Sequence, residues 1–352
     1  MEKTIDINPI PYLTWNWLKI NKDNVSYDFA LTENNGSDSP LPAGISVSSG
    51  KSVNTELPEP EVAIGKEASE LITSTASGKI YTFEKIKEEA KPLIIRIKAD
   101  TNSASYNIIH AKAGADCKII LVYEGSSSLS GTVTKIYAEE DSNVHISKVQ
   151  LFKKSVNQID DTQVICGDRA KVSLTQIILG GAHTNASFHA TLAGYQSAFY
   201  SDTAYICQKN QYLDMNQVVV HTGKKTVCDM KTHGTARDEA TKTYRGTIDM
   251  RKGCAGSVGN EIETTLLLSP KAVVKAAPII LCGEEDISAE HGSTIGKLSN
   301  EMLFYMNSRG IDQKTAENLL TRAKITAAAS AIEDESIQEA INQWLNQKTE
   351  ID

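Results

Sequence analysis

Short runs of apolar residues recur through the middle of the chain, between residues 92 and 282. These runs are rich in Val, Ile and Leu, and they are either continuously apolar or alternate with polar residues, as in 93–97, 118–123, 172–179 and 217–220. Runs of this length and composition are typical of β-strands, whereas helical periodicity is almost absent from the region. The pattern predicts a β-rich core.

Small or polar turns precede successive apolar runs at regular intervals. They occur at 114–116, 140–142, 167–169, 194–196 and 223–225, roughly 26 to 29 residues apart, which suits one coil of a β-solenoid. In such a fold each strand pairs with its equivalent in the next coil, so only the two ends remain as open edges. A β-sandwich is the alternative, but its turn signals should come about every 8 to 12 residues. The spacing favours the solenoid.

The flanks of this core follow a different pattern. Residues 1–88 mix short helical and loop signals, with a Ser/Asn/Gly-rich stretch at 33–50. After Gly283 helical signals dominate: Ser299 can cap a helix that Gly310 ends, Asp312 can cap the next, and 337–345 is amphipathic. The chain is therefore predicted to have a mixed, partly helical region at 1–88, a β-helix core at 89–282 and a helical region at 283–352.

Composition excludes several classes of protein. The chain has 352 residues, a net charge of −8 and no basic cluster, which argues against a nucleic-acid partner. It contains no apolar run near the ~18 residues of a membrane span and no signal pattern at its start, so a cytoplasmic location is expected. The six cysteines are scattered without a C-x-x-C pair. Free and mostly buried thiols are expected, including Cys254 and Cys282.

Enzyme signatures are missing from the sequence. There is no phosphate-binding G-x-x-x-x-G-K-[ST] loop, so no ATP site is expected, and no G-x-S-x-G, H-E-x-x-H or G-x-G-x-x-G motif. Paired acids at 160–161 and 284–286 leave a carbohydrate-active β-helix enzyme as an alternative. The aromatic content of 6% and the missing signal count against it, and solvated turns explain both groups of acids.

The most specific segment reads EHGSTIGK at 290–297, followed by LFYMNSRGI at 303–311. It resembles the SufB/SufD family of iron–sulfur cluster assembly proteins, most closely SufD, and the strand pattern YRGTI at 244–248 is similar to that family too. The resemblance implies a right-handed parallel β-helix core. It also implies a scaffold subunit, without enzymatic activity of its own, that pairs with a SufB-like chain and docks the SufC ATPase.

The resemblance assigns residues to these roles. His291, with Glu290 beside it, becomes the candidate ligand of a transient iron–sulfur cluster shared with the partner, since neutral imidazole can bind iron. SufB-type chains carry a second acid where this chain has Gly292, and the position of their sulfur-accepting cysteine falls at about Ala272. Cys254 and Cys282 flank this region and are the alternative thiols, although burial is expected of both. The candidate SufC-docking residues are Phe304, Tyr305, Arg309 and Gly310.

Two matters stay open at this point. The partner is either a SufB-like subunit or, in a homodimeric SufB-like scaffold that works with SufC alone, a second copy of the chain. Reduced flavin (FADH2) is associated with such complexes, although the sequence shows no flavin motif.

Overall fold

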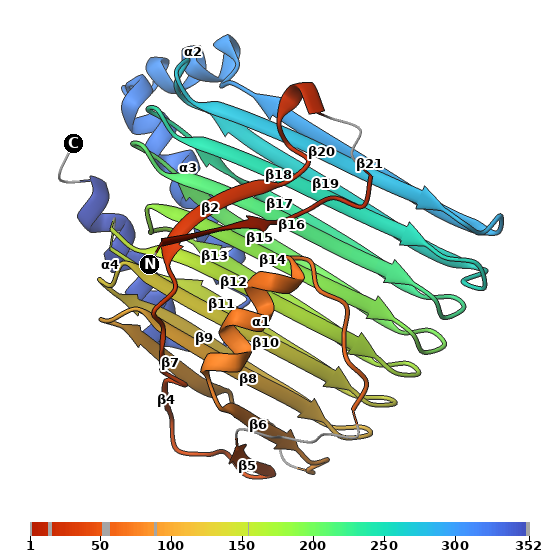
Figure 1. The fold of residues 1–352 in the computed structure, drawn as a ribbon. Coiled ribbons are helices and arrows are strands. Elements are labelled where there is room, and N and C mark those ends of the chain that lie inside the picture. The colour runs from red at the N-terminus through yellow and green to blue at the C-terminus, as the bar shows by residue number, and fades with distance from the viewer. Residues whose placement is uncertain (1, 13–15, 51–56, 88–89, 154, 350–352) are drawn as a thin grey trace.

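Two parallel β-sheets face each other and form the body of the protein. The computed structural model describes the chain except residues 1, 13–15, 51–56, 88–89, 154 and 350–352, so the predicted boundary at 88/89 lies outside the described residues. Consecutive strands alternate between the sheets, as Figure 1 shows. The even sheet contains β6 (Gly78–Phe83), β8 (Ser103–Ala111), β10 (Leu129–Ala138), β12 (Asn157–Cys166), β14 (His183–Leu192), β16 (Tyr212–His221), β18 (Thr241–Met250) and β20 (Val273–Cys282). The odd sheet contains β7 (Leu93–Ala99), β9 (Asp116–Gly125), β11 (Asn143–Gln150), β13 (Lys171–Ile178), β15 (Ala198–Cys207), β17 (Val227–Ala236), β19 (Ser257–Leu267) and β21 (Ile287–Gly296).

Equivalent residues of successive coils stack in register. In the even sheet an apolar ladder lines the lumen, the side-chain-filled space between the inner faces of the two sheets; its members are Ile109, Ile136, Val164, Ala190, Val219 and Ile248. Residues with positive φ recur in the turns at one end of the coils, at Gly114, Asp141, Arg169, Gln196 and Lys225, roughly 27 to 29 residues apart. The predicted parallel β-solenoid is confirmed.

The N-terminal segment covers the outer face of the even sheet (Figure 1). It contains the antiparallel pair β1 (Glu2–Ile7) and β2 (Asp23–Asp28), the short helix η1 (Asn16–Leu18) and helix α1 (Lys66–Thr75). The fully buried Arg245 of β18 holds it in place: its Nε donates to the Ile20 carbonyl at 2.6 Å, and its guanidinium pairs with Asp214. Asn8 Nδ2 also donates to Asp214, at 2.6 Å. The segment is therefore attached by buried polar contacts as well as apolar ones.

Three helices follow the last strand: α2 (Asn300–Ser308), α3 (Gln313–Ala329) and α4 (Glu335–Thr349). Of these, α3 and α4 cover the odd sheet, whereas α2 packs against α3. Ile325 and Ile341 of α3 and α4 pack with Val149 and Ile177 of the sheet in one buried cluster. The predicted caps are confirmed, because the Ser299 and Asp312 side chains accept from the backbone N–H groups three residues on, Met302 and Thr315.

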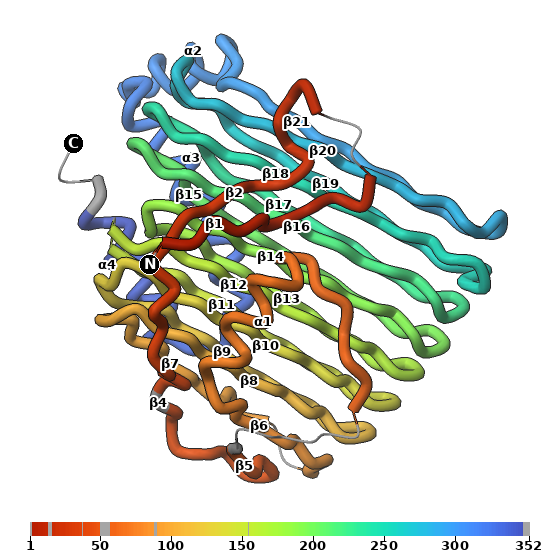
Figure 2. Tube along the Cα trace, in the orientation of Figure 1, coloured from red at the N-terminus to blue at the C-terminus, as the bar shows by residue number. Residues whose placement is uncertain are grey.

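The two ends of the solenoid differ. At the N-terminal end, β5 (Ile45–Gly50) and β4 (Ser37–Asp38) add antiparallel strands to β6 and β7, and β3 (Thr32–Glu33) pairs with β8. At the other end, no further strand of the described chain pairs with β20 or β21, although each is ten residues long. This open end, formed by β20 and β21, is the last coil in Figure 2. Two long strand edges with unpaired backbone groups are thus exposed there.

Candidate functional site

His291 lies on β21 at the mouth of the lumen. Ile287 and Ala289 pack against the core, and the Ser293 Oγ donates to Glu263 at 2.6 Å, so odd-numbered residues of β21 face inward. His291 shares this face and is in register with Glu261 of β19. Because no later coil covers it, its side chain remains exposed. The structure therefore presents an inward-facing imidazole to any molecule that covers the open end.

Glu290 has a different environment from its neighbour. Successive residues of a strand point to opposite faces, so the exposed Glu290 side chain faces the outside of the odd sheet. Gly292 lies on the same outer face, and a Cβ built there would meet nothing within 4 Å. Contacts within this chain therefore do not require glycine at 292.

A buried ion pair lies beneath the open end. Lys242 Nζ of β18 reaches Glu263 Oε1 of β19 across the lumen at 2.5 Å, and both side chains are fully buried. Thr265 hydrogen-bonds the same carboxylate and the Tyr205 hydroxyl. Burial lowers the pKa of the Lys242 ammonium, and the neighbouring Glu263 carboxylate opposes that shift. The pair neutralises two charges that would otherwise be costly in the lumen.

Glu261 is a second buried carboxyl, two residues away on the same inner face. Its exposed fraction is 1%, and among the described residues neither of its oxygens has a hydrogen-bond partner. Burial raises its pKa to about 8. It fits because residue 246 is glycine: a Cβ there would lie 1.9 Å from Glu261 Oε1. A buried acid that has the Tyr244 hydroxyl beside it, but no hydrogen bond of regular geometry, therefore lies directly behind His291.

The cysteines differ from the prediction at one position. Five are buried, as expected, but Cys282 is exposed. The prediction that Cys282 is buried is wrong, because it ends β20 at the open end, where no next coil covers the apolar run that contains it. Ala272 lies in the turn before β20 rather than on a strand. The preceding strand, β19, contains no cysteine in its sequence SVGNEIETTLL.

Helix α2 presents aromatic side chains to solvent. Phe304 is 77% exposed and Tyr305 57% exposed, and no residue of this helix is buried. The Arg309 guanidinium lies over the Tyr305 ring at 5.1 Å, and Gly310 ends the helix with φ +79°. A groove of about 350 Å³ separates α2 and α3 from the turn after β19, with Leu267, Leu268, Leu298 and Leu303 in its lining. The rest of the lining is mainly polar, including Lys297 and Glu317. Exposed aromatics beside a groove of mixed character are typical of protein-binding surfaces.

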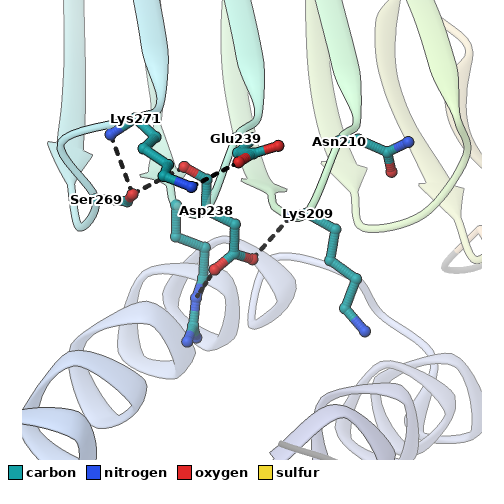
Figure 3. Close-up of a pocket in the computed structure, with 7 residues that line it drawn as sticks. Lys209, Asn210, Asp238, Glu239, Ser269 and Lys271 are labelled. Atoms are coloured by element: carbon teal, nitrogen blue, oxygen red, sulfur yellow. Dashed lines mark hydrogen bonds and ion pairs between the residues drawn. The ribbon is translucent and has the colours of Figure 1, made fainter.

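A larger surface depression, of about 720 Å³, lies among the turns near α3 (Figure 3). Its charged side chains interact with one another: Lys271 Nζ lies 2.8 Å from Glu239, and the Lys209 backbone N–H donates to Asp238 at 2.8 Å. Arg237 at its edge donates to Asn318 of α3. These contacts join the turns to each other and to the helix, and we assign them a structural role.

Two kinds of feature, a metal-binding cluster and a membrane-spanning helix, are missing from the described residues. In the part of the chain that the structure describes, no group of three or more His, Cys, Asp or Glu side chains is placed to hold a metal ion. None of the described helices combines the length and apolar character needed to cross a bilayer.

Sequence patterns pointed to His291 but missed the acids and the lysine beneath it. The available signal was Glu261-x-Glu263-x-Thr265 alternating within a strand. Charged residues at such spacing normally indicate a solvent-facing side, and only the fold shows that this side faces the lumen.

Comparisons with known proteins agree with the architecture. Residues 94–324, more than half of the chain, match the family model "SUF system FeS cluster assembly, SufBD core domain". The chain is 23% identical to the iron–sulfur cluster assembly protein SufD of Escherichia coli over 210 residues, covering 58% of this chain and 49% of the relative. It is 25% identical to SufD of Bacillus subtilis over 156 residues, covering 44% of this chain and 36% of the relative.

A SufB protein matches at a similar level. Identity to SufB of Bacillus subtilis is 22% over 195 residues, covering 55% of this chain and 42% of the relative. In these three comparisons the chain spans between about a third and a half of the relative's length. Identity therefore does not separate the SufD type from the SufB type.

Proposed function

The chain belongs to the SufBD core domain family of the SUF iron–sulfur cluster assembly system, and from this membership we propose that it is a SufD-like scaffold subunit that pairs with a SufB-type chain through its open end. The observation that carries the proposal is the open end itself, with inward-facing His291 at the mouth of the lumen. Long unpaired strand edges bind extended strands of another chain readily.

Exposed apolar side chains around the open end support an interface there. Ile295 of β21 and Val273 of β20 are each 44% exposed. These residues lie on the last strands of the two sheets, so a partner that extends the sheets would cover them. Burying apolar surface would add to the backbone hydrogen bonds of the new strand pairs.

The SufD-like role rests on what β19 and β21 contain. Accepting sulfur needs a thiolate, and β19 has no cysteine, while Gly292 follows His291 where SufB-type chains carry an acid. We infer that the partner supplies the sulfur-receiving thiol and that this chain supplies the His291 imidazole to iron. The cluster is thus cargo that the two subunits hold transiently.

Helix α2 is the proposed docking site for the SufC ATPase. Its support is the exposed Phe304 and Tyr305, the Arg309 side chain over Tyr305, and the adjoining groove with its leucine side chains. The sequence has no phosphate-binding loop, so ATP hydrolysis falls to the partner. By analogy with the family, movement of the ATPase would open the junction between the paired solenoids.

Two variants test the separate roles of the open end and of α2. The chain is co-expressed with a SufB-type chain and a SufC-type ATPase. His291→Ala should leave the three-component complex intact but lower its cluster-bound iron and sulfide several-fold, because a ligand is lost without loss of the strand edges. Unchanged iron and sulfide would remove the role assigned to His291.

Phe304→Asp is the matched variant for α2, and its expected effect is on ATPase binding. It should weaken ATPase binding more than tenfold, corresponding to about 2 kcal/mol for loss of a buried aromatic anchor, while the SufB-type chain still co-purifies. Retention of the ATPase would contradict docking at α2. Recovery of the unmodified chain with the ATPase alone, as a dimer that holds a cluster, would favour the homodimeric scaffold instead.

A further inference from the structure

We propose that Glu261 and His291 together form a two-ligand site for a ferrous ion at the mouth of the lumen, which the partner subunit or cluster sulfide completes. This inference rests on the proposed function, since that function makes iron the cargo. It adds a buried residue of β19 to the exposed imidazole of β21.

The two side chains are close enough to share an ion. Glu261 and His291 are directly opposite in the parallel register of β19 and β21, and both face the lumen. Neighbouring strands lie about 4.8 Å apart, a separation that a glutamate and a histidine side chain can bridge through one bound ion. Glu290, by contrast, faces the outside of the sheet.

The state of Glu261 indicates that a ligand is missing from its surroundings. Buried carboxyl groups normally have hydrogen-bond partners, yet neither oxygen of Glu261 has one among the described residues. The nearby cation is already used, because Lys242 pairs with Glu263. The Tyr244 hydroxyl lies beside Glu261 and partly opposes the rise in its pKa, but its hydrogen bond of regular geometry goes to Gln217 Oε1 at 3.3 Å. A cation at the mouth of the lumen would satisfy the carboxylate.

Gly246 of β18 provides the space for the Glu261 carboxylate. A Cβ at 246 would lie 1.9 Å from Glu261 Oε1, so a larger residue there would force the Glu261 carboxyl out of its present position. The backbone of Gly246 does not have a positive φ, so its role here is to leave space. Glycine at 246 thus lets the acid lie at the mouth of the lumen.

The donor set fits a ferrous ion held weakly. Imidazole and carboxylate together are common ligands of Fe(II) sites that keep open positions. Only two such groups meet here, in agreement with the absence of any three-member group among the described residues. A site with two ligands from this chain would release its ion to a growing cluster, as a scaffold requires.

The test is direct metal binding to the intact chain, purified without metal and handled anaerobically. Calorimetric titration with Fe²⁺, and the visible absorption of Co²⁺ as a surrogate, should show one weak site in the unmodified chain. Glu261→Gln keeps the shape of the side chain and should lower the affinity at least tenfold, with an unchanged circular dichroism spectrum. Glu285→Gln, which alters an exposed acid in the turn before β21, should not change it.

A double variant shows whether both residues bind the same ion. If they do, the double variant Glu261→Gln with His291→Ala should lose little more Fe²⁺ affinity than either single variant, because either change alone already removes the shared site. Equal Fe²⁺ affinity in Glu261→Gln and the unmodified chain, additive losses, or a loss confined to Glu290→Gln would each overturn the proposal. The titration uses the isolated chain, so its failure is distinguishable from failure to pair with a SufB-type subunit.

Discussion

Replacing Lys242 with methionine is expected to lower the free energy of unfolding by roughly 3–5 kcal/mol, the usual cost of leaving one partner of a buried ion pair uncompensated. Lys242 and Glu263 are fully buried and 2.5 Å apart, so Lys242→Met leaves the Glu263 carboxylate with hydroxyl groups, Thr265 and Ser293, as its remaining partners. Denaturant unfolding monitored by circular dichroism measures the change.

Two further variants identify the cause. Lys271 pairs with Glu239 at the surface, where both side chains are largely exposed, so Lys271→Met should cause no measurable change. Changing both Lys242 and Glu263 to methionine should recover part of the stability that Lys242→Met loses, because no charge is then left unpaired in the lumen. Equal stabilities of Lys242→Met and Lys271→Met would contradict the buried pair.

The stability of the unmodified chain is expected to fall between pH 5 and pH 9 more than that of Glu261→Gln. Burial raises the pKa of Glu261 to about 8 from the ordinary 4.5. A carboxyl with a raised pKa in the folded state contributes stability that is fully present below the unfolded pKa and is lost as the pH rises through the folded pKa. The difference between the two proteins should reach a few kcal/mol in this window.

The measurement compares unfolding curves of the two proteins in a metal chelator at several pH values. Other buried acids contribute slopes of their own. The prediction that the acids at 160–161 lie in a solvated turn is wrong, because both are buried on β12. Burial raises the pKa of Asp161 to about 7 and that of Asp214 to about 6. Those contributions are common to both proteins and cancel in the difference. A difference that stays constant between pH 5 and pH 9 would show that Glu261 is not held as a buried, unpartnered acid.

The coil architecture was predictable because each coil repeats the same local signals. Turn residues such as Gly114 and Asp141 recur at one coil spacing, and Ser299 and Asp312 cap the helices that follow the core. These signals are local, so the sequence carries them without knowledge of contacts between distant residues.

The details of the site depend on contacts between the two sheets and on the absence of a following coil, and these were less predictable. Cys282 follows an apolar run and was expected to be buried, but exposure is decided by the absence of a following coil. Lys242 and Glu263 lie on consecutive strands that belong to different sheets, and they meet only across the lumen. The surroundings of Glu261 likewise depend on Gly246 in another strand.

Amide hydrogen exchange with and without a SufB-type partner shows whether the open end joins a second solenoid. We expect amides of Val273–Cys282 and Ile287–Gly296 to gain strong protection in the complex, because their strand edges become paired, while amides of β6 and β7 at the far end do not change. Unchanged exchange in β20 and β21, within a complex that nevertheless forms, would contradict this pairing.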